Sequence, residues 1–325
     1  MRPFNFEKVK TVAEATSKKS VNSQFIAGGT NLVDLMKKNI SQPDVLIDIT
    51  SAMSKEIRFE KRQLNIGAMV SNTKVATDQQ VLDKFPLLSK AILAGASPQI
   101  RNMASSAGNL LQRTRCPYFY DVTTPCNKRK PESGCSAAEH GTRMSAVAGY
   151  NDKCVAVHPS DFCVALSALD AKVIAVNAED KEVKIPFQDF HKLPGNTPWL
   201  DNNLPENTVI TNIEVPENNF TKNYAYLKVR DRASYAFALV SVAAGLDLSG
   251  NKIKEARLAS GGVAHKPWRW YDAEKFLKGK EATEDNFIKA AKLATRDLKP
   301  LKENAFKIPM LEGAIVEVLN QSIHR

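Results

Sequence analysis

The N-terminal fold is decided by one stretch, FIAGGTNLVDLMKKNISQPDVLIDI at residues 25–49. Its first five residues are typical of a short strand that runs into a turn, and TNLVDLMKKN has apolar residues at helical spacing. VLIDI, at residues 45–49, is typical of a second buried strand. Together these segments predict a compact βαβ unit over residues 20–50.

The turn of this unit is a candidate phosphate site. Gly28 and Gly29 allow a ligand to approach the backbone closely, and Thr30 and Asn31 open the helix with free N–H groups that favour an anion. The turn lacks the G-x-G-x-x-G spacing of the dinucleotide fingerprint. A strand-to-helix turn without a ligand therefore remains an alternative.

A second unit follows, with a predicted strand at 64–70 and helical segments at 72–84 and 86–95. It continues into IRNMASSAGNLLQ at 100–112, which is again rich in small residues. Two such loops in one chain favour a ligand more strongly than one does. The residues expected to supply small side chains and backbone donors here are Ser105, Ser106, Gly108 and Asn109.

The later part of the chain alternates strand and helix patterns. Ser160 is expected to cap the helix DFCVALSALDA, and Thr283 is expected to cap another. From about residue 222 the pattern changes to antiparallel strands that turn at SGNK, residues 249–252. This favours a separate α+β domain. The other expected elements are a hairpin at 172–185, a strand at 208–215, and helices at about 272–278, 283–296 and 310–322.

Composition excludes several classes of protein. The 325 residues carry a formal net charge of +10, but the basic residues are dispersed and no basic run is interleaved with aromatic residues. We therefore expect no nucleic-acid binding, and an acidic partner or cofactor phosphates would explain the charge equally well. No stretch reaches the roughly 18 consecutive apolar residues of a membrane helix, and the first ten residues show no secretory signal.

Four of the five cysteines lie within one stretch, with the spacing C-x9-C-x8-C-x18-C and no C-x2-C pair. The spacing alone leaves an iron–sulfur cluster, a zinc ion and free thiols as alternatives. The two central cysteines lie in PCNKRKPESGC, a polar segment that cannot form a core. Cys163 lies instead on an apolar helix and is expected to pack. The four clustered cysteines are Cys116, Cys126, Cys135 and Cys154.

Two histidines near this stretch, His140 and His158, are interpreted as structural residues. Trp199, Trp268 and Trp270 are expected in the core or at a subunit interface rather than stacked on a cofactor. No Ser-His-Asp set or pair of carboxylates stands out.

Five motifs, taken in this order, resemble the FAD-binding medium subunit of the molybdenum hydroxylase (xanthine oxidase) family. The resemblance covers essentially the whole chain, and the cysteine-bearing segments are most similar to the bacterial aldehyde oxidoreductase branch. The motifs are AGGTNL at 27–32, RNMASSAGN at 101–109, SDF at 160–162, YLKVR at 226–230 and GGVA at 261–264, with a proline following at 267.

The resemblance implies an α+β protein with a two-lobed PCMH-type FAD-binding domain and a CO dehydrogenase flavoprotein-like C-terminal α+β domain. The first lobe is expected at 1–60, the second at 61–218 with a Cys-rich 4Fe-4S insert at 113–156, and the C-terminal domain at 219–325. FAD is expected between the lobes. The family often has Gly-Gly-Asn where this chain has Ala107-Gly108-Asn109, which puts a contact at Ala107 in doubt.

The same resemblance implies the FAD contacts. Asp161 is expected on the adenosine side, and Lys228 near the isoalloxazine ring. Other contacts are expected from the second loop, and the pyrophosphate is expected on the first. The second-loop residues are Ala104, Ser105, Gly108 and Asn109, and those of the first loop are Ile26, Ala27, Gly28, Gly29, Thr30, Asn31, Leu32, Val33 and Asp34.

The implied function is electron transfer within a heterotrimeric complex. A large partner subunit with molybdenum cofactor would oxidise an aldehyde to a carboxylic acid, and a small partner with 2Fe-2S clusters would relay electrons. FAD on this chain would pass them to an external electron acceptor, with a 4Fe-4S cluster on the four cysteines as an added relay. The alternatives are a stand-alone PCMH-type FAD oxidase or dehydrogenase and a zinc-bearing nucleic-acid-binding protein. The expected location is the periplasm, reached with a signal-bearing partner, or otherwise the cytoplasm.

Overall fold

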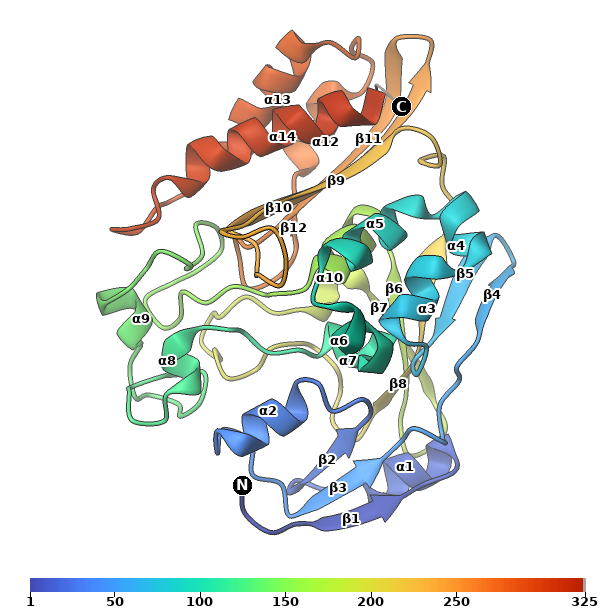
Figure 1. The fold of residues 1–325 in the computed structure, drawn as a ribbon, viewed down its shortest axis with the longest axis vertical. Coiled ribbons are helices and arrows are strands. Elements are labelled where there is room, and N and C mark those ends of the chain that lie inside the picture. The colour runs from blue at the N-terminus through green and yellow to red at the C-terminus, as the bar shows by residue number, and fades with distance from the viewer. Residues whose placement is uncertain (324–325) are drawn as a thin grey trace.

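The computed structural model describes residues 1–323 and begins with a small parallel sheet. Its strand order is β1-β3-β2, formed by β1 (Asn5–Lys8), β2 (Ser23–Ile26) and β3 (Val45–Asp48), and helices α1 (Val12–Lys18) and α2 (Leu32–Lys37) make the crossovers. Parallel strands need such crossovers. The predicted βαβ unit is confirmed as β2, α2 and β3. This sheet lies at one end of the molecule, the lower end in Figure 1.

The second sheet is antiparallel, with the strand order β4-β5-β8-β6-β7. Its inward residues, such as Leu64, Ile66 and Ile213, are almost inaccessible to solvent. The strand expected at 64–70 and the hairpin expected at 172–185 both belong to it. The strands are β4 (Ile57–Glu60), β5 (Gln63–Gly67), β6 (Lys172–Val176), β7 (Glu182–Pro186) and β8 (Val209–Pro216).

Short helices cover the second sheet. The segment predicted as one helix over 72–84 is divided at Asp78, which has an extended backbone and whose carboxylate accepts hydrogen bonds from the amides of Gln80 and Val81. An Asx cap of this kind competes with continued helix. The helices are α3 (Asn72–Thr77), α4 (Gln79–Lys84), α5 (Pro86–Ala94), α6 (Pro98–Met103), α7 (Ser106–Leu110) and the short α11 (Phe187–Phe190).

Helix α10 (Asp161–Ala168) is buried along its whole length. The predicted cap at Ser160 is confirmed, because its hydroxyl accepts a hydrogen bond of 3.1 Å from the amide of Cys163. One side of α10 packs on α5, and the other faces the C-terminal sheet. Helix α10 therefore joins the second sheet's layer to the last domain.

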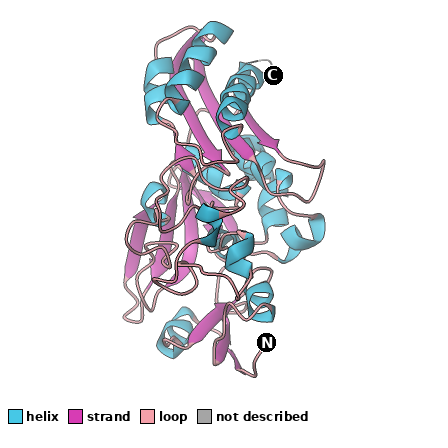
Figure 2. Ribbon diagram, turned by 90° about the vertical axis from the view of Figure 1, so that its left-hand side faces the viewer, coloured by secondary structure: helices cyan, strands magenta, loops and turns pink. Residues whose placement is uncertain are grey.

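The C-terminal sheet has the order β12-β11-β10-β9 and is covered by three helices. The predicted turn at 249–252 is confirmed, since β10 ends at Ser249 and β11 begins at Lys252. Figure 2 shows this sheet and its helices at the end of the molecule opposite the N-terminal sheet. The elements are β9 (Tyr224–Val229), β10 (Val240–Ser249), β11 (Lys252–Gly261), β12 (Trp268–Arg269), α12 (Tyr271–Leu277), α13 (Glu284–Thr295) and α14 (Lys307–Ile323).

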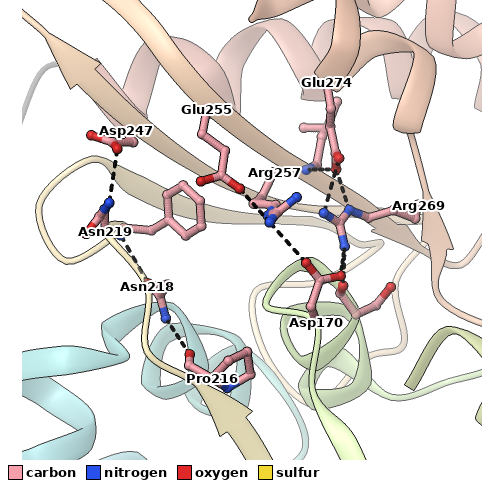
Figure 3. A network of polar contacts seen from close by, with 12 residues as sticks. Asp170, Pro216, Asn218, Asn219, Asp247, Glu255, Arg257, Arg269 and Glu274 are labelled. Atoms are coloured by element: carbon pink, nitrogen blue, oxygen red, sulfur yellow. Dashed lines mark hydrogen bonds and ion pairs between the residues drawn. The ribbon is translucent and has the colours of Figure 1, made fainter. Parts of the chain in front are cut away.

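Ion pairs centred on the buried Arg269 link the end of α10 to this domain (Figure 3). The Arg269 guanidinium donates to the carbonyl of Ser167 at 2.7 Å and to the carboxylate of Asp170 at 2.8 Å, both at the end of α10. It also pairs with Glu274, whose carboxylate accepts a hydrogen bond from the amide of Leu258 at 2.7 Å. These contacts fix the position of α10 relative to β11 and β12.

The cysteine-bearing segment, residues 113–156, contains the short helices α8 (Pro117–Tyr120) and α9 (Ser136–Glu139) and is otherwise made of turns. It lies along one side of the molecule, at the left in Figure 1, between α2 and the C-terminal sheet. The domain boundaries stay a prediction. The second sheet begins at Ile57, inside the segment expected to form the first lobe. Within residues 1–323, no helix is long and apolar enough to cross a bilayer.

Candidate flavin and cysteine sites

The loop between β2 and α2 carries free backbone donors. The amide N–H groups of residues 28–31 make no hydrogen bond with any group in the described part of the chain. Gly29 has a φ of +70°, a conformation that suits glycine. Consecutive free amides at the start of a helix are a suitable place for a phosphate. The residues predicted for the pyrophosphate therefore have the donors that this group requires.

Gly28 is required for a close contact within the chain. A Cβ atom at this position would lie 1.8 Å from the carbonyl oxygen of Met103, at the end of α6. The absence of a side chain lets the first loop lie directly against the backbone before Ala104. The close approach predicted for a ligand at Gly28 is thus made by Met103. This contact brings the two predicted FAD-binding loops together.

Three of the four backbone donors predicted in the second loop, those of Ser106, Gly108 and Asn109, are already used within the chain, whereas the Ser105 amide makes no hydrogen bond in the described part of the chain. The amides of Ser106 and Ala107 donate to carbonyls of Val70 and Ala68, and the Gly108 amide donates to the Ser105 hydroxyl, which caps α7. The loop is built as a cap against β5. Of its predicted contact residues, Gly108 is exposed and Ala104 and Ser105 are buried.

Asn109 and Ser160 connect the second loop to α10. The Ser160 hydroxyl donates to the side-chain oxygen of Asn109, so the small polar residues of two predicted motifs meet. Asn109 is only partly buried. Its amide group therefore remains accessible beside the start of α10.

Asp161 and Lys228 form a buried ion pair. The Lys228 Nζ lies 2.7 Å from Asp161 Oδ2, and the Tyr226 hydroxyl donates to Asp161 Oδ1 at 2.6 Å. Burial, followed by the charge of Asp161, raises the pKa of the Tyr226 hydroxyl well above its usual range. The two charged side chains were predicted for opposite ends of FAD. They cannot serve opposite ends of an extended ligand while this pair holds.

A cavity of about 230 Å³ lies between the cysteine segment, the start of α10 and the C-terminal sheet. Its wall includes Asp161 and Ser160, so the predicted adenosine-side residue faces it. A mostly apolar cavity with a few polar groups is typical of a cofactor site. Other side chains on its wall are Arg115, Met144, His158 and Phe237.

All four clustered cysteines line one smaller cavity, together with Lys128. The turn from Cys126 to Cys135 is closed by a hydrogen bond of 2.7 Å from the Asn127 amide to the Gly134 carbonyl. Cys154 reaches the same cavity from a second bridge, with Asn151. The structure therefore brings together thiols that are up to 38 positions apart in the sequence.

Two of these thiols interact directly. The Cys154 thiol donates a hydrogen bond to Cys135, which lowers the pKa of Cys135 to about 6. That bond and burial together raise the pKa of Cys154. Burial is also the main cause of the raised pKa of Cys116. A thiol whose pKa is lowered, surrounded by further thiols, is a suitable starting point for binding a thiophilic metal centre.

The two cavities are neighbours. Thr114, Cys116, Ala137 and Ala156 line both of them. A single layer of residues thus separates the space beside Asp161 from the space enclosed by the cysteines.

An ion cluster behind the cysteines was missed by sequence reasoning. Asp201 Oδ1 accepts from Lys128 Nζ at 2.6 Å, and Asp201 Oδ2 accepts from Arg113 Nε at 2.6 Å. The Arg113 amide also donates to Asn31 Oδ1 at 3.0 Å. Asp201 lies 73 residues from Lys128 and 88 from Arg113, and no local pattern marks it.

Cys163 is fully buried in the core, as predicted, and burial raises its pKa to about 12. Sequence reasoning missed its neighbour His191, whose ring centroid lies 4.3 Å from that of His158. Burial lowers the pKa of His191 to about 4 and that of His158 well below its usual range, so both rings are neutral. His140 is exposed. Trp270 is buried in the core of the C-terminal domain.

Comparison with known proteins decides the family. Residues 2–218 match the family model described as the FAD binding domain in molybdopterin dehydrogenase, and residues 224–308 match that of the CO dehydrogenase flavoprotein C-terminal domain. This chain belongs to the FAD-binding subunits of the molybdopterin dehydrogenases. It is therefore a subunit of an oxidoreductase, and the family and fold class expected from the sequence are confirmed.

Two curated relatives of this flavoprotein extend along nearly its whole length. The aldehyde oxidoreductase FAD-binding subunit PaoB of Escherichia coli K12 is 44% identical over 99% of both chains. The glyceraldehyde dehydrogenase medium chain of Sulfolobus acidocaldarius is 28% identical over 91% of this chain and 89% of its own.

Solved structures show the same fold at lower identity. Quinoline 2-oxidoreductase from Pseudomonas putida 86 matches with a TM-score of 0.76 and 21% identity, over 99% of this chain and 97% of that one. Carbon monoxide dehydrogenase from Hydrogenophaga pseudoflava matches with a TM-score of 0.76 and 22% identity, over 99% and 98%. The α+β architecture of this flavoprotein is thus shared with both.

Proposed function

We propose that this chain is the FAD- and 4Fe-4S-carrying electron-transfer subunit of a heterotrimeric molybdenum-dependent aldehyde oxidoreductase. The 44% identity to the E. coli aldehyde oxidoreductase subunit, over the full length of both chains, supports the substrate class. The observation that carries the electron-transfer role is the cavity lined by four cysteines beside a second, larger cavity. When bound, FAD supplies two-electron chemistry with an external acceptor, and the cluster supplies one-electron relay.

The residues of the first loop fit a pyrophosphate. The free amides of residues 28–31 would donate to its oxygens, and no acidic side chain interrupts them. Ile26, Ala27, Leu32, Val33 and Asp34 complete this loop as proposed contacts. From the second loop we propose Ala104, Ser105, Gly108 and the accessible side chain of Asn109, and beside them the Asp161–Lys228 pair as a unit.

The four cysteines fit an iron–sulfur cluster better than a single zinc ion. A zinc ion with thiolates at 2.3 Å holds its sulfur atoms roughly 4 Å apart. Within residues 1–323, the one set of three potential ligand atoms found within 4.8 Å of one another is that of His158, Cys163 and His191, and it includes none of the four. Cys135 and Cys154 are within hydrogen-bonding distance of each other, but no three of the four cysteine sulfurs meet this criterion, so they are not gathered around one point as a zinc ion requires.

The side chains around the cysteine cavity would bind the cluster, exclude water from it and hold the surrounding turns. The thiols at 116, 126, 135 and 154 would bind the cluster, and the shared wall at Cys116 would place it next to the flavin cavity. Burial of Cys126 and Cys154 would exclude water from the cluster. Arg129, which donates to the carbonyls of Tyr118 and Phe119 at 2.8 and 2.9 Å, would hold the surrounding turns in place.

The partners follow from the family. We propose a large subunit with molybdenum cofactor, where an aldehyde is oxidised to a carboxylic acid with water as the oxygen source, and a small 2Fe-2S subunit. We also propose export to the periplasm in complex with a partner that carries a signal. The genes beside this one test both points, since they should encode these subunits and a twin-arginine signal on the small one.

The central test is iron and labile sulfide in cysteine variants of the full chain. Serine at any of the four positions should lower each by about four atoms per chain, because a 4Fe-4S cluster rarely survives the loss of a thiolate. Cys163→Ser is the matched control, since it changes a buried thiol outside the cavity and should cost about 1 kcal/mol of stability with no loss of iron.

Two outcomes would contradict the proposal. Wild-type iron in Cys126→Ser or Cys135→Ser would show that the polar turn does not bind a cluster, and loss of iron in Cys163→Ser would show that the wrong four were chosen. A wild-type chain with flavin absorption and no iron would support the stand-alone PCMH-type flavoenzyme instead.

A further inference from the structure

Lys128 places a positive charge inside the wall of the cysteine cavity. Its side chain is 4% exposed and lines the cavity together with the four thiols. A lysine is rarely buried to this extent unless it is paired or has a task. Here the pairing is with Asp201, 2.6 Å away.

The ion cluster around Asp201 has an excess of positive charge. Burial raises the pKa of the Asp201 carboxyl, but Arg113 and Lys128 outweigh it and hold that pKa at about 2. The carboxylate is therefore ionised, and two cations share one anion. Because Arg113 alone is sufficient to balance Asp201, Lys128 is the surplus charge, and it is also the cation on the cavity wall.

The charge of Lys128 reaches the cysteine sulfurs. Lys128 lines the same cavity as Cys154, and both residues are buried. A positive charge on this wall must favour any additional negative charge placed in the cavity. The interaction is poorly screened, since neither group is open to solvent.

We propose that Lys128, positioned by Asp201, raises the reduction potential of the cluster held by the four cysteines. Reduction adds one negative charge to the cluster, and a fixed buried cation stabilises the reduced state more than the oxidised state. This inference rests on the proposed 4Fe-4S site. Lys128 acts here through its charge and as a positioning residue.

The arrangement predicts that substitutions of Lys128 and of Asp201 shift the reduction potential of the cluster in opposite directions. Lys128→Met removes the surplus cation, and Asp201 keeps Arg113 as a partner 2.6 Å away, so no buried charge is left unpaired. The cluster potential should fall. Asp201→Asn removes the anion, leaves both cations, and keeps an oxygen that can accept a hydrogen bond. The potential should rise.

The test is a redox titration of the full chain, followed by low-temperature EPR of the reduced cluster. In Lys128→Met we expect the ratio of reduced to oxidised cluster at a given potential to fall at least tenfold, a shift of about 59 mV for a one-electron couple. Lys128→Arg keeps the charge and should stay near wild type. Lys130→Met is the matched control, because it makes the same charge change two residues away at an exposed position and should leave the potential unchanged.

The outcomes distinguish a failure of the proposed cluster from a failure of the role proposed for Lys128. Iron or an EPR signal missing from the wild-type chain would reject the cluster itself. A cluster present in all variants with no difference between Lys128→Met and Lys130→Met would overturn the role of Lys128, as would shifts of the same sign in Lys128→Met and Asp201→Asn. Loss of the cluster from both of these variants would assign the pair to cluster assembly and also overturn the inference. If only Lys128→Met loses the cluster, a raised reduction potential in Asp201→Asn still supports the role of Lys128.

Discussion

The Lys228 ammonium lies 2.7 Å from the Asp161 carboxylate, and this ion pair joins β9 to the first residue of α10. Both side chains are less than one tenth exposed. Lys228 also donates to the carbonyl of Ala94, at the end of α5. The pair thus connects β9, α5 and α10 beside Asp161, which lines the larger cavity.

Removing one charge of this pair should cost more than removing both. Asp161→Asn leaves Lys228 buried without a counterion, and we expect a loss of about 3 kcal/mol in the free energy of unfolding. Lys228→Met should cost a similar amount. The double variant should lose clearly less than the sum, as measured by urea unfolding. Additive losses would show that the two charges do not depend on each other.

Gly28→Ala should affect stability and FAD content together. The new methyl group would meet the Met103 carbonyl at 1.8 Å, so the two loops must separate. We expect a lower melting temperature and a lower ratio of FAD to protein. Gly313→Ala is the matched control, because its Cβ meets nothing within 4 Å on helix α14, and it should be neutral or stabilise by up to about 1 kcal/mol. Full FAD content in a destabilised Gly28→Ala variant would separate the loop contact from flavin binding.

His191 should make the protein sensitive to acid. Its pKa is lowered to about 4 in the folded state, mainly by burial, against about 6.5 when unfolded. The unfolded chain then binds more protons between these values, so stability falls as the pH falls through this window. Between pH 7 and pH 5 this single group should cost about 2 kcal/mol.

His191→Gln tests this point, since glutamine can still donate toward the Leu110 carbonyl that His191 contacts at 2.9 Å. Unfolding in urea at pH 7 and pH 5 should show a smaller pH dependence in the variant than in the wild type. An equal dependence in both proteins would mean that another group is responsible.

Arg269→Met should destabilise the protein in a pH-dependent way. Burial raises the pKa of the Glu274 carboxyl even with Arg269 beside it, and without Arg269 the pKa should rise further. Because the folded-state pKa is then above the unfolded value, the cost grows as pH rises through the folded-state pKa. We expect about 3 to 5 kcal/mol at pH 8 and less at pH 5. A double variant with Glu274→Gln should lose this pH dependence.

Much of the fold could be predicted because its signals are local. The turn at 249–252 and the cap at Ser160 each depend on residues within a few positions of one another, and the βαβ unit is contained within residues 23–48. The break at Asp78 was missed because a capping aspartate inside a helical pattern has the same spacing whether the helix continues or restarts. The boundary between the first and the second sheet could not be predicted to the residue, because β4 pairs with β5, the strand that follows it in the chain.

The candidate site was predictable only in part. Cysteines and glycine-rich loops can be recognised in the sequence from their residue types alone. The structure gathers all four clustered cysteines at one cavity. Asp201, His191 and the contact between Gly28 and Met103 have no such signal, because each depends on segments separated by tens of residues. The pairing of Asp161 with Lys228 likewise required the C-terminal sheet to be placed against α10.

Arg113 has a consequence for how the protein matures. It bonds to Asn31 in the first loop and to Asp201 near the second sheet, and its guanidinium lies 4.6 Å from the centre of the Phe119 ring in the cysteine segment. Three distant parts of the chain must be in place before Arg113 can make all of these contacts. Insertion of the proposed cluster would therefore require a chain in which these three parts have already come together, so we expect folding errors in any of them to give iron-poor protein in the cell.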